Sequence, residues 1–101
     1  MPKVIFNIQY ELKPDKKAEY LSVIRELKNL LKAEGLESYS VFEVKGKSNH
    51  FQEIYTFSSK EAYEAFDDDE NERINILINK LNDLTVENST KYTTLFEVVE
   101  N

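Results

Sequence analysis

The chain begins with a segment in which apolar and polar residues alternate. From Lys3 to Leu12 every second residue is apolar, which is the period of a β-strand with one buried face. The other set of positions is mostly polar but includes Ile5 and Asn7, so the pattern leaves open which face lines which part of the protein. Similar patterns predict three further strands, over residues 38–45, 51–57 and 91–99, with a hairpin loop at 46–50.

The segment after the first strand has the period of an amphipathic helix. Apolar residues between Tyr20 and Leu31 recur at spacings of three and four, which places them on one side of a helix. Pro14-Asp15 is typical of a helix start, with Asp15 as the capping residue. Gly35 is expected at the end, because the residue after a helix often needs a positive φ.

The second helical segment is interrupted by acidic residues. Ser58 and Glu61 have the spacing of a capping box and predict its start. The acidic run from Asp67 to Glu70 then separates two stretches with helical spacing. Adjacent like charges disfavour a straight helix there, and Asp or Asn can cap a new one. We therefore expect a short helix, a bend, and a longer helix that ends near Leu84.

The predicted elements follow the order strand, helix, strand, strand, helix, strand. This βαββαβ order is that of the ferredoxin-like fold, an α+β architecture in which a four-stranded antiparallel sheet carries both helices on one face. A length of 101 residues fits a single domain spanning residues 1–101. Ile5, Leu95 and Val99 would expose an apolar patch on the uncovered face that is larger than monomers usually tolerate. The pattern therefore predicts a homodimer.

Composition argues against several classes of protein. The net charge is −6, whereas nucleic-acid binding rests on clustered basic side chains, so no nucleic acid is expected as a partner. The chain has no cysteine, which excludes disulfides, thiolate metal sites and a cysteine nucleophile. No apolar run approaches the length of a membrane span, and the first residues have no signal-type pattern. We therefore expect a cytoplasmic protein without membrane contact.

Three short motifs resemble chemical sites without meeting their requirements. Gly46-Lys47-Ser48 ends like a phosphate-binding loop, but that loop needs an earlier glycine where Val41 stands. The acidic run lacks the central glycine and the ligand register of a calcium loop. His50 is the only histidine and falls in the predicted hairpin loop, without a carboxylate or serine at a known spacing. We therefore expect no metal site and no cofactor.

Aromatic side chains are concentrated on the predicted strands and on the short helix. Such residues form the core in most proteins, but a cluster of them with polar tips also lines pockets for flat apolar ligands. Asn7 and Glu53 lie inside predicted strands, and each must reach solvent or find a hydrogen-bond partner. Asn7 is therefore either a satisfied amide or a ligand contact. The aromatic residues of this group are Tyr39, Phe42, Phe51, Tyr55, Phe57, Tyr63, Phe66, Tyr92 and Phe96.

The stretch from Phe51 to Tyr63, together with residues 4–13 and the helix opened by Pro14-Asp15, resembles the antibiotic-biosynthesis-monooxygenase family of dimeric α/β barrels. The resemblance covers nearly the whole chain. It implies that two ferredoxin-like subunits press their open sheets together into a barrel, and that a cleft between each sheet and its helices holds a substrate. Members include cofactor-independent oxygenases of polycyclic phenols or quinols and haem-degrading enzymes, as well as proteins without known activity.

The resemblance also implies roles for particular residues. Asn7 is similar to the pocket asparagine with which several members hold a substrate or a haem-bound ligand. The histidine that many members carry on the second helix falls at Phe66, and the tryptophan common in active oxygenases is missing, so haem degradation is not expected. Oxygenation without a cofactor needs an electron-rich substrate, a polar group that orients it and a dry cavity.

Three functions remain open. The first is a cofactor-independent monooxygenase-like protein acting on a small aromatic or quinone-like molecule, with Asn7 orienting it and Tyr55 or Glu53 exchanging a proton. The second is a ligand-binding domain without chemistry, and the third is a structural dimer module. For the first two we expect a cavity that Asn7, Tyr55 and Phe66 share, with the acidic run as its movable edge. The residues expected to contact the ligand are Phe57, Tyr63 and Phe66.

Overall fold

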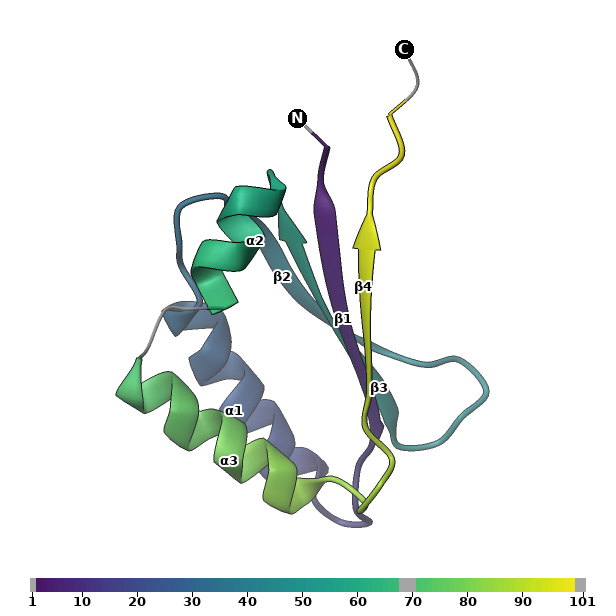
Figure 1. Cartoon of the computed structure of the whole chain (residues 1–101). Coiled ribbons are helices and arrows are strands. Elements are labelled where there is room, and N and C mark those ends of the chain that lie inside the picture. The colour runs from purple at the N-terminus through teal and green to yellow at the C-terminus, as the bar shows by residue number, and fades with distance from the viewer. Residues whose placement is uncertain (1, 68–70, 100–101) are drawn as a thin grey trace.

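A computed structural model describes residues 2–67 and 71–99 of the chain. This part of the chain contains four strands and three helices in the order β1, α1, β2, β3, α2, α3 and β4 (Figure 1). The second predicted helix is two helices, as the acidic interruption indicated. The bounds are Val4–Glu11 for β1, Lys17–Leu30 for α1, Leu36–Glu43 for β2, His50–Phe57 for β3, Lys60–Asp67 for α2, Glu72–Leu84 for α3 and Lys91–Phe96 for β4.

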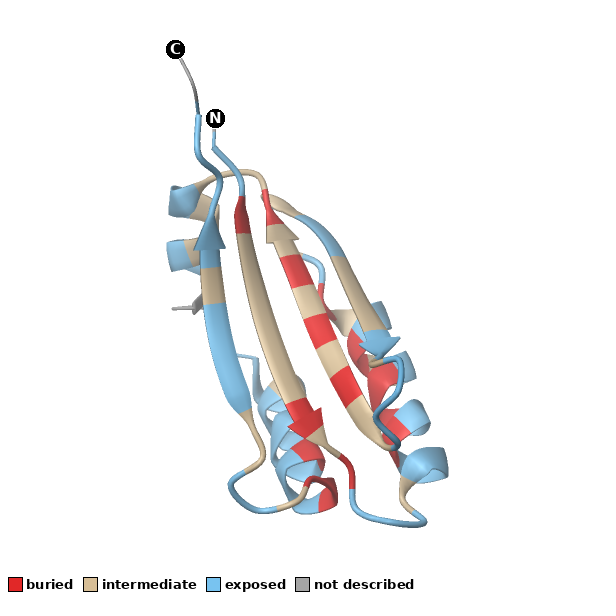
Figure 2. Ribbon diagram, turned by 90° about the vertical axis from the view of Figure 1, so that its right-hand side faces the viewer, coloured by how far each residue is buried: buried red, intermediate tan, exposed pale blue. Residues whose placement is uncertain are grey.

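The strands form one antiparallel sheet in the order β2-β3-β1-β4. Strand β1 lies between β3 and β4, so Phe6 pairs with Tyr55 on one side and with Thr94 on the other. All three helices cover one face of the sheet and leave the other face bare (Figures 1 and 2). This arrangement confirms the predicted α+β, ferredoxin-like fold.

Alternation along the strands determines which side chains enter the core. On β3 every second residue is buried, which Figure 2 shows as red bands across the strand. The buried residues face the helices, whereas Gln52, Ile54 and Thr56 face the open side of the sheet. The buried apolar residues are Val4, Tyr10, Leu12, Tyr20, Val23, Ile24, Leu27, Leu31, Phe51, Tyr55, Phe57, Leu77, Leu81 and Leu84.

Helix α1 packs on the sheet as predicted, but both of its ends differ from the prediction. Tyr20 and Leu27 are buried at the expected helical spacing. The helix begins at Lys17, and Asp15 does not cap it, because Asp15 has a positive φ of 64° and lies in the preceding turn. The helix ends at Leu30, before the predicted end.

Gly35 has its positive φ, 85°, just before β2 rather than at the end of α1. A Cβ atom at this position would lie 2.3 Å from the Cβ of Ala62 on α2. Glycine is therefore needed here for two reasons: the left-handed backbone conformation and the close approach of α2.

Helices α2 and α3 begin with side-chain caps. In α2 the Ser59 hydroxyl accepts a hydrogen bond of 3.1 Å from the Ala62 N–H, so Ser59 caps this helix and the predicted cap at Ser58 is wrong by one residue. In α3 the Asn71 side chain accepts a hydrogen bond of 3.0 Å from the Ile74 N–H. This cap confirms that a new helix begins directly after the acidic run.

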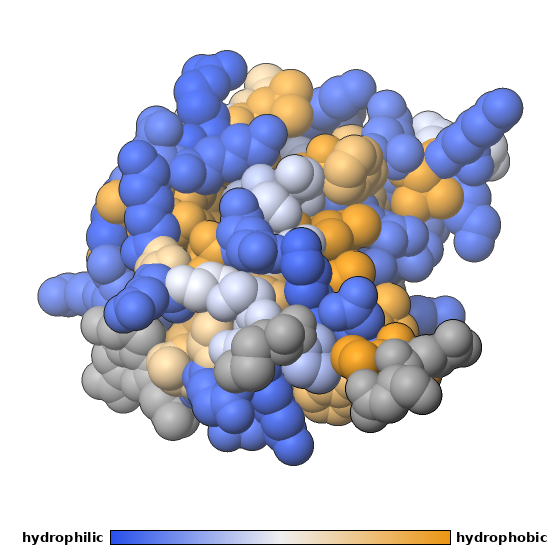
Figure 3. Space-filling view, turned by 90° about the horizontal axis from the view of Figure 1, so that it is seen from above, coloured by the Kyte–Doolittle hydropathy of each residue, from blue (hydrophilic) through white to orange (hydrophobic). Residues whose placement is uncertain are grey.

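Polar and apolar side chains are distributed unevenly over the surface. Hydrophilic side chains cover most of the end at which both termini lie, with apolar ones showing between them (Figure 3). On the open face of the sheet, Phe42 and Leu95 are about half exposed, at 55% and 50%. In the described part of the chain, no helix is long and apolar enough to cross a membrane.

Candidate functional site

A cavity of about 330 Å³ lies between the sheet and the helices. Strands β1 and β3 form its floor, α2 and α3 its cover, and β4 contributes to one side. The volume is at the lower end of the range for small-molecule sites, and most of the described lining residues are aromatic or aliphatic. The cavity is therefore large enough for a small ligand and suited to an apolar one.

The carboxyl group of Glu53 lies at the floor of the cavity, and only 2% of this residue is exposed. The Tyr39 hydroxyl donates a hydrogen bond of 2.7 Å to its Oε1 atom. Burial raises the pKa of this carboxyl group, and hydrogen bonding from Tyr39, Tyr10 and Tyr55 reduces the rise. Glu53 therefore keeps its proton to a higher pH than an exposed glutamate does.

Tyrosine hydroxyls surround the Glu53 carboxyl group. The hydroxyl oxygens of Tyr10 and Tyr20 lie 2.7 Å apart, so one donates a hydrogen bond to the other. Burial, and after it the charge of Glu53, raises the pKa of Tyr10, Tyr39 and Tyr55 above that of a free phenol. These hydroxyls therefore stay protonated at neutral pH and are available as hydrogen-bond donors.

Packed aromatic rings form the wall of the cavity between the sheet and α2. The ring centroids of Phe57 and Phe66 are 5.3 Å apart, and those of Tyr55 and Phe66 are 5.8 Å apart. The Tyr63 ring lies 5.5 Å from Phe57, and its hydroxyl is 3.3 Å from the Thr94 hydroxyl on β4. A flat apolar ligand would contact ring surfaces on this side.

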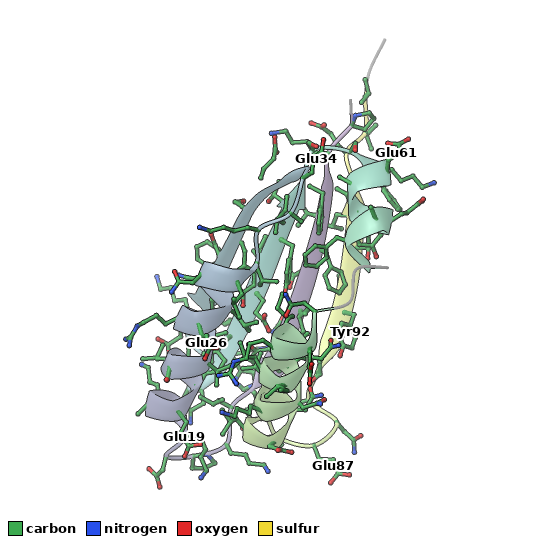
Figure 4. The ribbon with its side chains drawn as sticks, turned by 90° about the vertical axis from the view of Figure 1, so that its left-hand side faces the viewer. Glu19, Glu26, Glu34, Glu61, Glu87 and Tyr92 are labelled. Atoms are coloured by element: carbon green, nitrogen blue, oxygen red, sulfur yellow. The ribbon has the colours of Figure 1, made fainter. Side chains whose placement is uncertain are left out.

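The mouth of the cavity lies between α3 and β4. Asn75 and Asn82 line it from α3 and are exposed to solvent. Tyr92 lines the opposite side with 66% of its surface exposed, and its ring stacks on Phe6 at a centroid distance of 6.1 Å. Figure 4 shows Tyr92 on β4 at the level of α3.

Five of the residues singled out from the sequence line this one cavity. They come from two elements that are close in space, β3 and α2. Their grouping agrees with the expected cavity, while the roles assigned to them remain predictions. The residues are Glu53, Tyr55, Phe57, Tyr63 and Phe66.

Asn7 does not line the cavity, and the expectation that it shares the cavity with Tyr55 and Phe66 is wrong. Its neighbours Phe6 and Ile8 both face the cavity. Successive side chains of a strand point to opposite faces, so Asn7 faces the open side of the sheet.

On the open face, Asn7 belongs to a row of amide side chains. Its Nδ2 donates a hydrogen bond of 2.8 Å to Oε1 of Gln52. The Gln52 Nε2 in turn donates a hydrogen bond of 3.2 Å to Oε1 of Gln9. Of the two alternatives for Asn7, the satisfied amide is therefore the one that the structure supports.

The acidic run expected to form a movable edge falls mostly outside the described residues. Asp67 is the last residue of α2, and residues 68–70 lie outside the described part of the chain. The helices on either side of the run both contribute to the cavity, through Phe66 and Ile74. Its proposed role as an edge stays a prediction.

Sequence reasoning missed Tyr10 and the asparagines of α3 as parts of the site, and it named Tyr39 only as one of the aromatic residues on the strands. Strand parity carries a signal for the two tyrosines: Tyr10 lies on the cavity face of β1, and Tyr39 pairs with Tyr55 across β2 and β3. For Asn75 and Asn82 the helical period shows only that they lie beside the apolar stripe of the helix. That they line the cavity depends on how α3 packs over the sheet, which the sequence does not show.

Side chains that could together bind a metal ion are not grouped in the described part of the chain. Across residues 2–67 and 71–99, no group of three His, Cys, Asp or Glu side chains is placed to hold a metal ion. His50, predicted in a loop, is the first residue of β3, and its Nε2 lies 3.8 Å from a carboxylate oxygen of Glu11. No histidine is among the described residues that line the cavity.

Solved structures share this fold. A conserved protein from Methanosarcina mazei Go1 matches with a TM-score of 0.79 and 14% identity, over 94% of this chain and 92% of that one. A variant of SnoaB, a cofactor-independent oxygenase from Streptomyces nogalater, matches with a TM-score of 0.74 and 14% identity, over 92% and 90%. An antibiotic biosynthesis monooxygenase matches with a TM-score of 0.69 and 22% identity, over 100% of both chains. At these identities the likeness shows the fold alone.

The family follows from the sequence. The model of the antibiotic biosynthesis monooxygenase family matches residues 3–71, which is more than half of the chain. The chain belongs to this family, and the resemblance noted from the sequence is confirmed. No curated protein sequence gives a significant match.

Proposed function

We propose that the protein is a cofactor-independent monooxygenase-like enzyme that acts on a small aromatic or quinone-like molecule in the cavity between the sheet and the helices. The observation that carries this proposal is the buried Glu53 carboxyl group, which faces an aromatic cavity and has a raised pKa. A carboxylate whose pKa is raised is a stronger base than an exposed one, so Glu53 can take a proton from a phenol and return it. Membership of the antibiotic biosynthesis monooxygenase family agrees with this chemistry.

The proposed reaction uses the substrate's own electrons. Glu53 removes the proton of a phenol whose para carbon carries hydrogen, and the electron-rich ring then reduces dioxygen. One oxygen atom forms a new carbonyl group on that carbon and the other leaves as water, so a phenol and dioxygen give a quinone and water. Tyr55 and Tyr10 donate hydrogen bonds in the cavity, and its mostly aromatic and aliphatic lining limits the water around the reacting ring.

The position of Asn7 supports a second candidate function. Asn7 was the residue expected to orient the substrate, and it faces away from the cavity. The second candidate is therefore a protein that binds the same class of ligand without turning it over. In the proposed enzyme, orientation falls to Glu53 and Tyr55.

Oxygen uptake with a panel of polycyclic phenols separates these candidates. We expect the wild type to consume oxygen and form a quinone. Glu53→Gln should still bind the phenol but consume oxygen at least a hundredfold more slowly, and Tyr55→Phe should retain part of the activity. Glu61→Gln, on the exposed side of α2, is the matched control and should keep full activity. Binding by the wild type without oxygen uptake would support the second candidate, and absence of binding would contradict both.

We also propose that two copies of the chain pair through their open sheet faces. Apolar residues on this face include Phe42 and Leu95, each about half exposed, and Ile54 at its centre. Bare sheet faces of this kind are usually covered by a partner, and a second copy offers the same apolar groups and amide row.

A further inference from the structure

The polar groups at the cavity mouth come from one side of α3. Asn75, Ile78 and Asn82 are spaced by three and four residues, so they lie along one side of the helix, and all three line the cavity. Asn71 lines it too, but its side-chain oxygen already caps the helix. Asn75 and Asn82 are therefore the asparagines of α3 that line the mouth without capping the helix.

The charges around the cavity are as informative as its shape. Among the described lining residues there is no Lys, Arg or His, and Glu53 is the only one with a carboxyl group. The whole chain carries a net charge of −6. An anionic ligand would enter without a cation to pair with and would lie near a buried carboxyl group, which is unfavourable in a cavity of low polarity.

An asparagine amide offers both donors and an acceptor, so it pairs equally well with carbonyl and hydroxyl oxygens. Asn75 and Asn82 are seven residues apart, which is about 10 Å along a helix axis. An aromatic ligand that reaches both amides must therefore be longer than a single ring and carry oxygens along one edge.

We propose that Asn75 and Asn82 select an uncharged, elongated aromatic ligand with hydrogen-bonding oxygens along the edge that faces α3. This inference rests on the proposed function in that it assumes a small aromatic ligand in the same cavity. It goes beyond that function by excluding anionic ligands and by assigning specificity to two residues of α3.

Equilibrium binding without oxygen tests the inference separately from turnover. The probes are a hydroxyanthraquinone, an anthraquinone sulfonate with the same rings and an anionic group, and anthracene, which has the rings without oxygens. Quenching of tyrosine fluorescence reports binding, because the chain has six tyrosines and no tryptophan. We expect the hydroxyanthraquinone to bind at least tenfold more tightly than the sulfonate.

Substitutions on α3 then test the two residues. Asn75→Ala and Asn82→Ala should each weaken binding of the hydroxyanthraquinone about threefold to tenfold, the loss of one hydrogen bond, and leave anthracene binding unchanged. Asn79→Ala is the matched control, because Asn79 is an exposed asparagine of the same helix that does not line the cavity. Alanine favours the helix, so none of the three variants should fail to fold.

Two results would overturn the inference. One is equal binding of the sulfonate and the hydroxyanthraquinone, and the other is equal binding by Asn75→Ala, Asn82→Ala and Asn79→Ala. If either occurs while the wild type consumes oxygen with a phenol, the inference fails and the proposed function stands. If the selectivity holds in a protein that consumes no oxygen, the inference stands and the enzymatic proposal fails.

Discussion

Glu53 connects the interior hydrogen bonds of the protein with its cavity. Its Oε1 atom accepts a hydrogen bond from the Tyr39 hydroxyl, and the residue also lines the cavity beneath α3. Tyr39 itself is only partly buried on β2. This carboxyl group is therefore held in place from the core side, while the same residue contributes to the lining of the cavity.

The raised pKa of Glu53 makes a prediction about stability. The folded carboxyl group keeps its proton to a higher pH than the unfolded one, whose ordinary value is 4.5. Its contribution to stability is therefore complete below that pH and is lost as the pH rises through the folded pKa. We expect the difference in unfolding free energy between the wild type and Glu53→Gln to fall as the pH rises above 4.5, as measured by urea denaturation. Parallel curves for the two proteins would show that burial does not shift this group.

Asn7 makes a prediction of the opposite kind. Because its amide bonds to Gln52 on the open face, Asn7→Ala should leave ligand binding in the cavity unchanged within a factor of two. We expect instead a small loss in stability of about 1 kcal/mol, the usual size for one hydrogen bond. Ligand titration and urea denaturation of the same variant measure both effects. A large loss of ligand affinity would place Asn7 back in the binding site.

The alternation of residues in the first strand indicates on which face Asn7 lies, but the family resemblance favoured a place for Asn7 in the substrate pocket. Alternation along the first strand puts Asn7 on the opposite face from Phe6 and Tyr10. The same alternation on β3 puts Glu53 and Tyr55 on one face of the strand, and both line the cavity. Asn75 and Asn82 could not be found in this way, because their place depends on how α3 packs over the sheet.

At the scale of elements, Gly35 lies where α1, α2 and β2 come close together. It has a left-handed backbone before β2, and α2 passes directly over it at Ala62. The hydrophobic period predicted the helices themselves, since it depends only on sequence. Their ends depend on local hydrogen bonds and backbone conformation, such as the Ser59 hydroxyl that accepts the Ala62 N–H at the start of α2.

Two glycine substitutions separate backbone strain from collision. Gly46 also has a positive φ, 82°, but a Cβ there would meet nothing within 4 Å. We expect Gly46→Ala to cost about 1 kcal/mol of unfolding free energy through the left-handed backbone alone. Gly35→Ala should cost about 2–4 kcal/mol, because overpacking against α2 is added. Denaturant titration of both variants checks this, and equal losses would show that α2 yields without cost.

At the scale of the whole molecule, the sheet divides the protein into two environments. The helices cover one face (Figure 2), and the cavity lies on that side. The other face carries the amide row and several apolar side chains. The element order was sufficient to predict a bare face. It could not show what covers that face, because the same surface chemistry suits any partner with a flat apolar sheet.

A charge on the open face tests the proposed homodimer. Leu95→Lys should raise the dissociation constant at least tenfold, because a buried unpaired ammonium group would have to be desolvated in the interface. Leu21→Lys, a change at a similarly exposed leucine on α1, is the matched control and should leave association unchanged. Sedimentation velocity across a concentration series measures both. A wild type that stays monomeric at micromolar concentration would contradict the dimer.

The strict alternation on β3 has a consequence for how this protein can vary in evolution. Glu53 and Tyr55 face the cavity, and their neighbours Gln52 and Ile54 face the opposite side. Inserting or deleting one residue in this strand would exchange the two sets, so the ligand site and the proposed pairing surface would be lost in a single step. Length changes should therefore be tolerated in the hairpin around Gly46, where a Cβ would meet nothing, and be purged from β3, even though individual side chains on either face can be replaced one at a time.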